Sequence, residues 1–326
     1  MPFAPWQQRA WTRATDALDS GRMGHALLIC GPAGLGQRAV VERLAQWLLC
    51  RARTADAPPC GTCRSCQLFA AGTHPDLNLV SLVPNKEGTK LRTEIVIEQV
   101  RALSERLALT PQYGGAQIAI MDPADAINRA ACNALLKTLE EPQPGRYLWL
   151  LSADPARLPA TIRSRCQRLE FRLPAHDEAL AWLRSQNHAE DAATEALRAA
   201  RGHPGLADAW LREGNLALRR EVASDLAQLA RGDSAMIQTA QRWVADDQAD
   251  LRLRFAADLA LAEASGLTGM LTNGARTRTL AVWFDAANRT RELLRTTVRN
   301  DLAVAELLLA WRSEPDAQVA TGGRGR

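Results

Sequence analysis

One segment of the chain reads Cys30-Gly31-Pro32-Ala33-Gly34-Leu35-Gly36-Gln37-Arg38. An apolar run over 26–29 precedes it and a helical pattern over 39–49 follows it, an order that indicates strand, glycine loop and helix. The phosphate loop of nucleotide-binding proteins has the pattern G-x-x-x-x-G-K-[ST], and Gly31 and Gly36 hold both of its glycine positions. We therefore expect a phosphate-loop type of fold.

The two residues that give this loop its chemistry are replaced. A lysine would neutralise phosphate oxygens and a hydroxyl would ligate Mg²⁺, whereas Gln37 has no charge and Arg38 has no acceptor for a metal. Losing one such preorganised contact typically costs roughly 3 kcal/mol of transition-state stabilisation. The sequence predicts a degenerate loop that does not hydrolyse ATP, formed by Gly31, Gly34, Gly36, Gln37 and Arg38. Passive nucleotide binding stays open, as does a glycine-rich turn that never bound phosphate.

Length and composition indicate a globular protein. With 326 residues, 47% of them hydrophobic, the chain can form two or three domains with a substantial core. A net charge of +4 permits contact with nucleic acid but falls short of a strongly basic DNA-binding domain. We expect no signal peptide, and no apolar run approaches the roughly 18 residues of a membrane span. The prediction is a soluble, cytoplasmic protein without membrane contact.

Four of the seven cysteines, Cys50, Cys60, Cys63 and Cys66, form a C-x9-C-x2-C-x2-C cluster. In a cytoplasmic chain this spacing favours a metal over disulfides. Four thiolates fill the shell of a tetrahedral Zn²⁺ and leave no open position, which is typical of a structural site. We predict a structural zinc without His74 as a ligand; unliganded or redox-active thiols are the alternative. The other three cysteines are expected to be core or incidental thiols.

Strand and helix patterns alternate through the first half of the chain. The expected elements are a helix within 6–23, strands over 26–29, 77–80, 117–122, 147–151 and 169–171, and helices over 39–49, 95–108 and 128–141. Their alternation indicates a parallel α/β sheet. One strand ends in Asp122, where a carboxylate would reach Mg²⁺ at the carboxyl end of the sheet. Asp122 is either a vestige of a metal site or a residue that only opens a turn.

Two arginines, Arg163 and Arg165, lie in a short polar segment before the last expected strand. Most arginines are solvated surface residues. An arginine held in this part of a nucleotide-binding domain can instead be offered to a neighbour's γ-phosphate as an arginine finger. The sequence therefore leaves two interpretations of this segment.

From residue 174 onward the sequence shows helical patterns and no further strand pattern. The predicted helices cover 176–186, 190–201, 216–230, 235–245, 251–261, 280–298 and 302–311. We expect an α/β domain followed by all-helical domains. The predicted boundaries are 1–170 for a nucleotide-binding-like domain with a zinc module at 50–66, 171–208 for a helical lid, and 209–326 for a third, helical domain with a disordered tail at 315–326.

Five motifs together resemble the AAA+ clamp-loader family of bacterial DNA polymerase III. They are His25-Ala26-Leu27-Leu28 leading into the glycine loop, the four-cysteine module, Thr73-His74-Pro75-Asp76, Asn133-Ala134-Leu135-Leu136-Lys137-Thr138-Leu139-Glu140-Glu141-Pro142, and Ser164-Arg165-Cys166. The likeness covers the first two predicted domains. The third is supported mainly by order, length and the helix over 302–311.

The resemblance implies a helical collar that builds a hetero-pentamer with delta and gamma/tau subunits. In that family the gamma/tau subunits hydrolyse ATP while the complex loads the sliding clamp onto primed DNA, and a delta-prime type of subunit serves as a rigid stator. Gln37, Arg38 and Pro123 depart from the ATPase pattern, and Gly202-His203-Pro204-Gly205 lacks a nucleotide-sensing arginine. These departures point to the delta-prime type, in which Arg165 would complete a neighbour's ATP site.

The resemblance thus predicts a subunit of the DNA-directed DNA polymerase III holoenzyme without ATPase activity of its own. Two alternatives belong to other classes of function. One is a divergent, gamma/tau-like subunit that hydrolyses ATP at its own loop. The other is a zinc-dependent nucleic-acid-binding protein, which would need a basic, aromatic-rich groove, whereas the aromatic residues are scattered along the chain.

Overall fold

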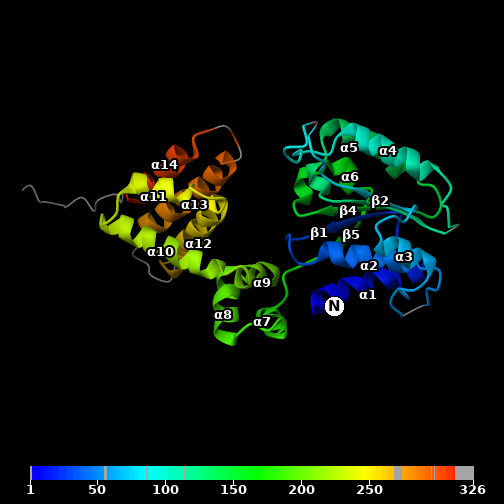
Figure 1. Ribbon diagram of the computed structural model, residues 1–326, viewed down its shortest axis with the longest axis horizontal. Helices are drawn as coiled ribbons and strands as arrows, with labels where there is room; N and C mark the ends of the chain where they lie inside the picture. Colours follow the sequence, from blue (N-terminus) through cyan, green and yellow to red (C-terminus); the bar gives the residue numbers. More distant parts are fainter. Residues whose placement is uncertain are drawn as a thin grey trace, which may run out of the picture. The chain divides into compact units, whose positions relative to one another are not determined.

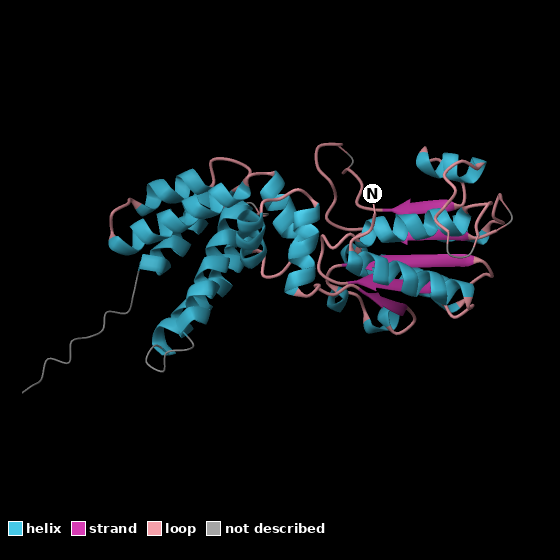
Figure 2. Ribbon diagram, turned by 90° about the horizontal axis from the view of Figure 1, so that it is seen from below, coloured by secondary structure: helices cyan, strands magenta, loops and turns pink. Residues whose placement is uncertain are grey.

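The computed structural model describes residues 2–54, 57–85, 87–113, 115–267, 274–294, 296 and 298–312. The chain divides into two compact units, Met1–Asp208 and Ala209–Arg326. Figure 2 shows that the strands belong to one part of the chain and that the rest of the described chain is helical. The tail predicted over 315–326 lies outside the described residues, and the three-domain scheme stays a prediction.

Five parallel strands form one sheet in the order β2-β3-β4-β1-β5. The strands are β1 Ala26–Cys30, β2 Leu77–Val80, β3 Gln117–Met121, β4 Arg146–Ser152 and β5 Gln167–Glu170. A parallel sheet covered on both faces needs nearly continuous apolar strands, and β1 is buried along its whole length. The predicted parallel α/β sheet is confirmed, with strand ends within two residues of the expected ones.

Helices cover both faces of this sheet (Figure 1). The helices of this part are α1 Pro5–Asp19, α2 Gln37–Leu49, α3 Arg64–Ala70, α4 Ile97–Ala108, α5 Arg129–Glu140 and α6 Ala160–Arg163. Because side chains alternate along a strand, Leu27 and Ile29 share a core with α1 and α2. Ala26 and Leu28 share the opposite core with α4, α5 and α6. The sheet is therefore a rigid platform for the loops at its two ends.

All strands run the same way, so the sheet has a carboxyl end and an amino end. The carboxyl end carries the loop after β1 and Asp122 after β3. At the amino end, Leu27 pairs with Gln167, and Arg165 lies two residues before this pair, in the turn that precedes β5. Going from His25 to Gly31 takes six steps of about 3.3 Å each along β1, or roughly 20 Å. The degenerate loop and Arg165 therefore lie at opposite ends of the sheet.

The remaining described chain is helical. Its helices are α7 His176–Ser185, α8 Glu190–Ala199, α9 Pro204–Arg212, α10 Asn215–Arg231, α11 Met236–Trp243, α12 Ala249–Leu267, α13 Gly274–Leu293 and α14 Asn300–Arg312. Helices α10, α13 and α14 are joined by tryptophans: Trp311 donates to the Leu226 carbonyl at 3.0 Å, and its ring lies 4.8 Å from that of Trp283. No described helix is long and apolar enough to cross a membrane.

Three helices were not expected from the sequence. Helices α3 and α6 are too short for a periodic pattern, and α3 begins within the residues we assigned to the metal module. Helix α9 begins at Pro204, within the segment Gly202-His203-Pro204-Gly205, whereas the predicted helices end at residue 201 and resume at residue 216. Proline is favoured in the first turn of a helix, because the N–H that it lacks has no intrahelical partner there. The predicted helix over 280–298 instead covers Gly274–Leu293.

Candidate functional site

The loop after β1 has positive φ angles at Gly31, Gly34 and Gly36. Gly31 has φ 145°, and a Cβ at this position would lie 2.2 Å from the carbonyl oxygen of Phe171. Gly36 has φ 85°, and its Cβ would meet the side-chain nitrogen of Gln7 at 2.0 Å. Since these positions require glycine for backbone shape and close packing, the glycine pattern persists here without any need for a phosphate.

The side chain of Gln37 turns back into its own loop. Its Nε2 donates to the carbonyl oxygens of Pro32 at 2.6 Å and of Gly31 at 3.3 Å. A lysine in this position would extend toward the β- and γ-phosphates. Gln37 therefore uses its donor group within the protein and brings no positive charge to the site.

Three other side chains donate to loop carbonyls. The ring N–H of Trp6 and the amide of Gln7, both on α1, donate to the Leu35 carbonyl at 2.9 and 3.0 Å. The buried His203 contacts the Ala33 carbonyl at 2.8 Å through Nε2. Its Nδ1 accepts from the backbone N–H of Leu206, so Nε2 is the donor. These contacts fix the loop from outside, and no sequence motif pointed to them.

Arg38 crosses the carboxyl end of the sheet to Asp122. Its Nη1 lies 2.9 Å from the Asp122 carboxylate, and its Nε lies 2.5 Å from Glu42 on the next turn of α2. Partial burial opposes the charge, but the hydrogen bonds to Glu42 and Asp122 outweigh it and raise the pKa of Arg38. A permanent cation therefore neutralises the carboxylate that would otherwise be available to Mg²⁺.

A small cavity remains beside this ion pair. Its volume is about 220 Å³, and its lining includes Gly31, Gln37, Arg38, Asp122 and Ser152. Ligand pockets commonly enclose about 300–1,000 Å³. The Oγ of Ser152, at the end of β4, is buried there without a hydrogen-bond partner. The structure thus brings the predicted loop residues and Asp122 to one place, where Gln37, Arg38 and Asp122 are engaged by other groups of the protein.

Arg165 lies at the amino end of the sheet, away from the loop. Its Nη2 is 2.7 Å from the Glu140 carboxylate at the end of α5, and its Nη1 donates to the Thr161 carbonyl at 2.9 Å. The Arg165 side chain is 37% exposed and that of Glu140 is 50% exposed. Arg165 is therefore a held but accessible cation.

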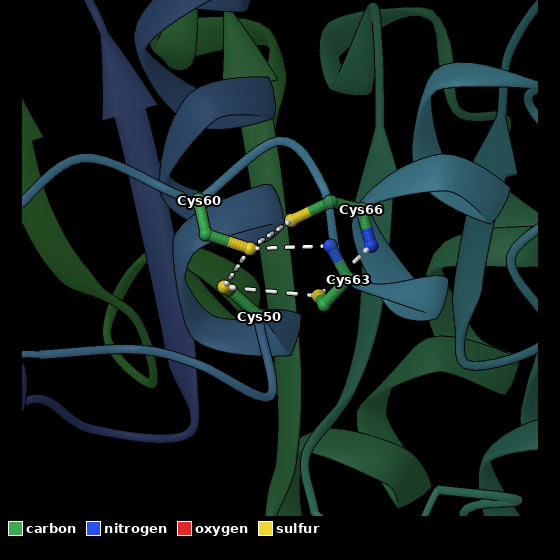
Figure 3. A group of neighbouring side chains, drawn as sticks. All are labelled: Cys50, Cys60, Cys63 and Cys66. Carbon is green, nitrogen blue, oxygen red and sulfur yellow. Dashed lines mark hydrogen bonds between the residues drawn. The ribbon is translucent and has the colours of Figure 1, made fainter.

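The four clustered cysteines converge from three segments. The sulfur atoms of Cys50, Cys60, Cys63 and Cys66 all lie within 4.8 Å of one another, and Figure 3 shows them facing one another. The sulfur–sulfur distance is 3.6 Å for Cys50–Cys60, 4.0 Å for Cys50–Cys63 and 3.9 Å for Cys60–Cys66. A tetrahedral metal with bonds of about 2.3 Å to sulfur has sulfur–sulfur edges of about 3.8 Å. The cluster can hold a metal ion of that size.

Local backbone contacts lower the pKa of two of these thiols, Cys60 and Cys63. The backbone N–H of Cys63 points at the Cys60 sulfur at 3.3 Å, and that of Cys66 points at the Cys63 sulfur at 3.5 Å. Backbone hydrogen bonds from Cys63 and Thr62 lower the pKa of Cys60 to about 6. Burial raises the pKa of Cys66 to about 12. Within the part of the chain that the structure describes, this is the one group of possible metal ligands.

His74 is a structural link rather than a ligand. Its Nδ1 accepts from the backbone N–H of Asp76 at 3.1 Å, so its Nε2 donates to the Ser65 hydroxyl at 2.8 Å. Ser65 in turn donates to the Leu49 carbonyl at 2.6 Å, at the end of α2. This buried relay ties the cysteine module to the start of β2, which explains the Thr-His-Pro-Asp motif. The prediction that the other cysteines are core thiols is also confirmed, since Cys30, Cys132 and Cys166 are buried.

The strand order, the glycine loop at the carboxyl end and the following helices define an AAA+ type of nucleotide-binding domain with helical domains after it. A family model described as DNA polymerase III, delta subunit, matches residues 6–175. DNA polymerase III subunit delta′ of Pseudomonas aeruginosa is 37% identical over 243 residues, which cover 73% of this chain and 70% of that relative. The Escherichia coli subunit delta′ is 32% identical over 95% of both chains. The chain belongs to the delta-prime family of DNA polymerase III subunits.

Other similarities cover less of the chain or have a lower sequence identity. DNA polymerase III subunit tau of Escherichia coli is 34% identical over 171 residues, which cover 52% of this chain and 25% of that relative. A solved gamma-subunit-related protein from Thermotoga maritima has a TM-score of 0.49 and 16% identity, over 93% of this chain and 98% of its own. The resemblance inferred from the motifs is confirmed at the level of the family by the delta′ relatives.

Proposed function

We propose that the chain is a clamp-loader stator: a subunit that does not hydrolyse ATP itself and that supports ATP-dependent loading of the sliding clamp onto primed DNA. The observation that carries this proposal is the Arg38–Asp122 ion pair at 2.9 Å, together with the Gln37 amide turned into its own loop. The Asp122 carboxylate, which would meet Mg²⁺, and the Gln37 side chain, which would meet the phosphates, are both engaged within the protein. Hydrolysis at this loop would need charge that it does not supply.

The proposed partners are delta and gamma/tau subunits in a hetero-pentamer. The sliding clamp and primed DNA are reached through that complex. Names of relatives support membership in DNA polymerase III, and tau shares sequence with about half of this chain. Because replication of a bacterial chromosome takes place in the cytoplasm, the proposal also assigns the chain to that compartment.

Arg165 is the residue that we propose acts on a neighbouring subunit. It lies roughly 20 Å along the sheet from Gly31, too far for one side chain to reach its own loop. A head-to-tail arrangement of subunits brings different surfaces of neighbouring copies together. In such an arrangement an accessible arginine at the amino end of one sheet can meet a phosphate at the carboxyl end of the next.

The metal that we propose for Cys50, Cys60, Cys63 and Cys66 is zinc. Four sulfur ligands at tetrahedral spacing suit Zn²⁺ and leave no position for substrate. When bound, the ion would supply structural cross-linking of α2, the segment after it and α3. The proposed role is stability of the module and no chemistry of its own.

The experiment measures ATP binding and hydrolysis by the purified chain, first alone and then with delta and gamma/tau subunits, the clamp and primed DNA. We expect no turnover by the chain alone. In the complex, Arg165→Ala should slow clamp loading by about tenfold or more, because an arginine finger contributes about 10³-fold or more to hydrolysis in other nucleotidases.

Arg168→Ala is the matched control, since Arg168 is an exposed arginine on β5 three residues further on. It should leave clamp loading unchanged. Turnover by the isolated chain would contradict the stator proposal and favour a divergent ATPase subunit. Wild-type ATPase and clamp loading with Arg165→Ala would contradict the role in trans.

A further inference from the structure

Three sequence motifs that the loop does not explain meet at the amino end of the sheet. His25 precedes β1, Glu140 ends α5, and Arg165 follows α6. Leu27 on β1 pairs with Gln167 on β5, and Gln167 also accepts from the backbone N–H of Gly24 at 2.9 Å. This hydrogen bond links the first residue of β5 to the segment just before β1.

The contacts of Arg165 fix its guanidinium on one side. One Nη group pairs with the Glu140 carboxylate at 2.7 Å, and the other donates to the Thr161 carbonyl at 2.9 Å. A guanidinium has five N–H donors in a rigid planar fork. Two contacts therefore set the plane of the group and leave three N–H groups for an acceptor from outside. Such an arrangement suits a phosphate on another subunit.

The position of Glu140 is itself fixed. His25 contacts the carbonyl oxygen of Leu139 through Nε2 at 2.9 Å, so it holds the last turn of α5. This helix ends at Glu140, and Pro142 follows shortly after. The carboxyl end of a helix carries a partial negative charge, which favours a cation there together with the carboxylate.

We infer that Glu140 is a positioning residue for Arg165, and that His25 fixes the helix end from which Glu140 acts. The inference rests on the proposed action of Arg165 on a neighbouring ATP. Glu140 does not touch the nucleotide. Its effect is to hold the guanidinium in one orientation before the subunits meet, which reduces the freedom lost when Arg165 binds phosphate.

The strength of the contact matches this role. Because the two side chains are 37% and 50% exposed, their ion pair is weak. It therefore does not keep Arg165 from binding a phosphate, which carries a higher negative charge. Loss of this ion pair should therefore reduce the rate of ATP hydrolysis by the complex only moderately. We expect about a threefold to fivefold fall for Glu140→Ala, against a much larger fall for Arg165→Ala.

The test compares ATPase kinetics of the reconstituted complex with wild type, Glu140→Ala, Glu140→Gln and Arg165→Ala. Glu140→Ala should lower kcat and leave KM for ATP nearly unchanged. Glu140→Gln, which keeps an acceptor oxygen, should recover part of the loss. In the Arg165→Ala background, Glu140→Ala should have no further effect, because both changes remove the same contribution.

Glu141→Gln is the matched control, because Glu141 is the adjacent exposed carboxylate outside the contact. It should leave kcat unchanged. Thermal unfolding of each variant separates positioning from a loss of fold. His25→Ala should lower kcat in the same direction as Glu140→Ala, and it should also do nothing further when Arg165 is absent.

Three outcomes separate the proposed role of Arg165 from the positioning role of Glu140. A wild-type rate with Arg165→Ala would contradict the proposed role of Arg165 on a neighbouring subunit. A strong fall with Arg165→Ala but a wild-type or higher rate with Glu140→Ala would leave that role intact and overturn the positioning role. An equal effect of Glu140→Ala with and without Arg165 would also overturn it.

Discussion

The two ends of the same sheet differ in how their charged groups are used. At the carboxyl end, Arg38 and Asp122 neutralise each other and Gln37 donates to its own loop. At the amino end, Arg165 contacts Glu140 in an exposed pair and keeps further donors. At one end of the sheet the charges are thus paired within the protein, whereas at the other end an exposed cation keeps unused donors.

The largest effect is expected where the carboxyl end retains its backbone shape. Gly31→Ala places a Cβ against the Phe171 carbonyl, 2.2 Å away, at φ 145°. We expect a loss of about 3–5 kcal/mol in the free energy of unfolding, measured by chemical denaturation. Such a loss would show that the loop is kept for folding although its phosphate chemistry is gone.

The control for this variant is Gly72→Ala. Gly72 also has a positive φ, 67°, but a Cβ at this position would meet nothing within 4 Å. Gly72→Ala should lower the free energy of unfolding by only about 1–2 kcal/mol, which is the penalty of the left-handed backbone. Equal losses for Gly31→Ala and Gly72→Ala would mean that the Phe171 contact contributes nothing.

Removal of the metal should have the next largest effect on stability. It should leave the charged groups at both ends of the sheet unchanged. Chelation of zinc from the four cysteines should lower the free energy of unfolding by about 3 kcal/mol if free zinc was held near 100 times its Kd. The measurement is thermal unfolding with and without chelator, with metal content determined in parallel. Protein purified without chelators that contains no stoichiometric zinc would contradict the metal assignment.

The sequence predicted the sheet and the cysteine cluster because both depend on local patterns. Apolar runs mark β1 and β3, and the spacing of four cysteines limits the ligands that can meet. The sequence could not predict that His203 would donate to the Ala33 carbonyl, because those residues are 170 positions apart and their contact depends on tertiary packing. The Glu140–Arg165 pair was hidden for the same reason, although both residues lie in motifs that the sequence singled out.

Restoring the two phosphate-loop residues should reduce the difference in how the two ends of the sheet use their charged groups. The double variant Gln37→Lys with Arg38→Thr supplies a cation for phosphate and a hydroxyl for Mg²⁺, and it frees Asp122. We expect Mg²⁺-dependent nucleotide affinity to rise by about tenfold, a change of about 1.4 kcal/mol. Equilibrium binding of a fluorescent ATP analogue measures it. Hydrolysis should stay absent, because Pro123 still stands where the ATPase pattern has a glutamate.

Arg43→Thr is the control for that variant, since Arg43 lies on the same helix and its guanidinium packs over the Phe3 ring instead. It should leave nucleotide affinity unchanged. An unchanged affinity in the double variant would mean that the contacts from Trp6, Gln7 and His203 close the loop by themselves.

The smallest effect concerns His74, which ties the cysteine module to the amino end of β2. Burial lowers the pKa of His74 against the opposing charge of Asp76. Because the folded pKa lies below the usual 6.5, the folded state binds fewer protons than the unfolded state as pH falls through that range. Its contribution to stability is therefore present above about pH 6.5 and is lost as pH falls toward the folded pKa.

Chemical denaturation between pH 7 and 5 measures this effect as a difference from His74→Gln, whose amide can donate to Ser65 but does not titrate in this range. We expect the free energy of unfolding to fall further in the wild type than in the variant, by less than about 1 kcal/mol. Loss of metal on acidification affects both proteins and cancels in the difference. A wild type that gains stability relative to His74→Gln as pH falls would mean that the charged imidazole is favoured in the fold, and that the relay from Asp76 through His74 to Ser65 is not what holds the module.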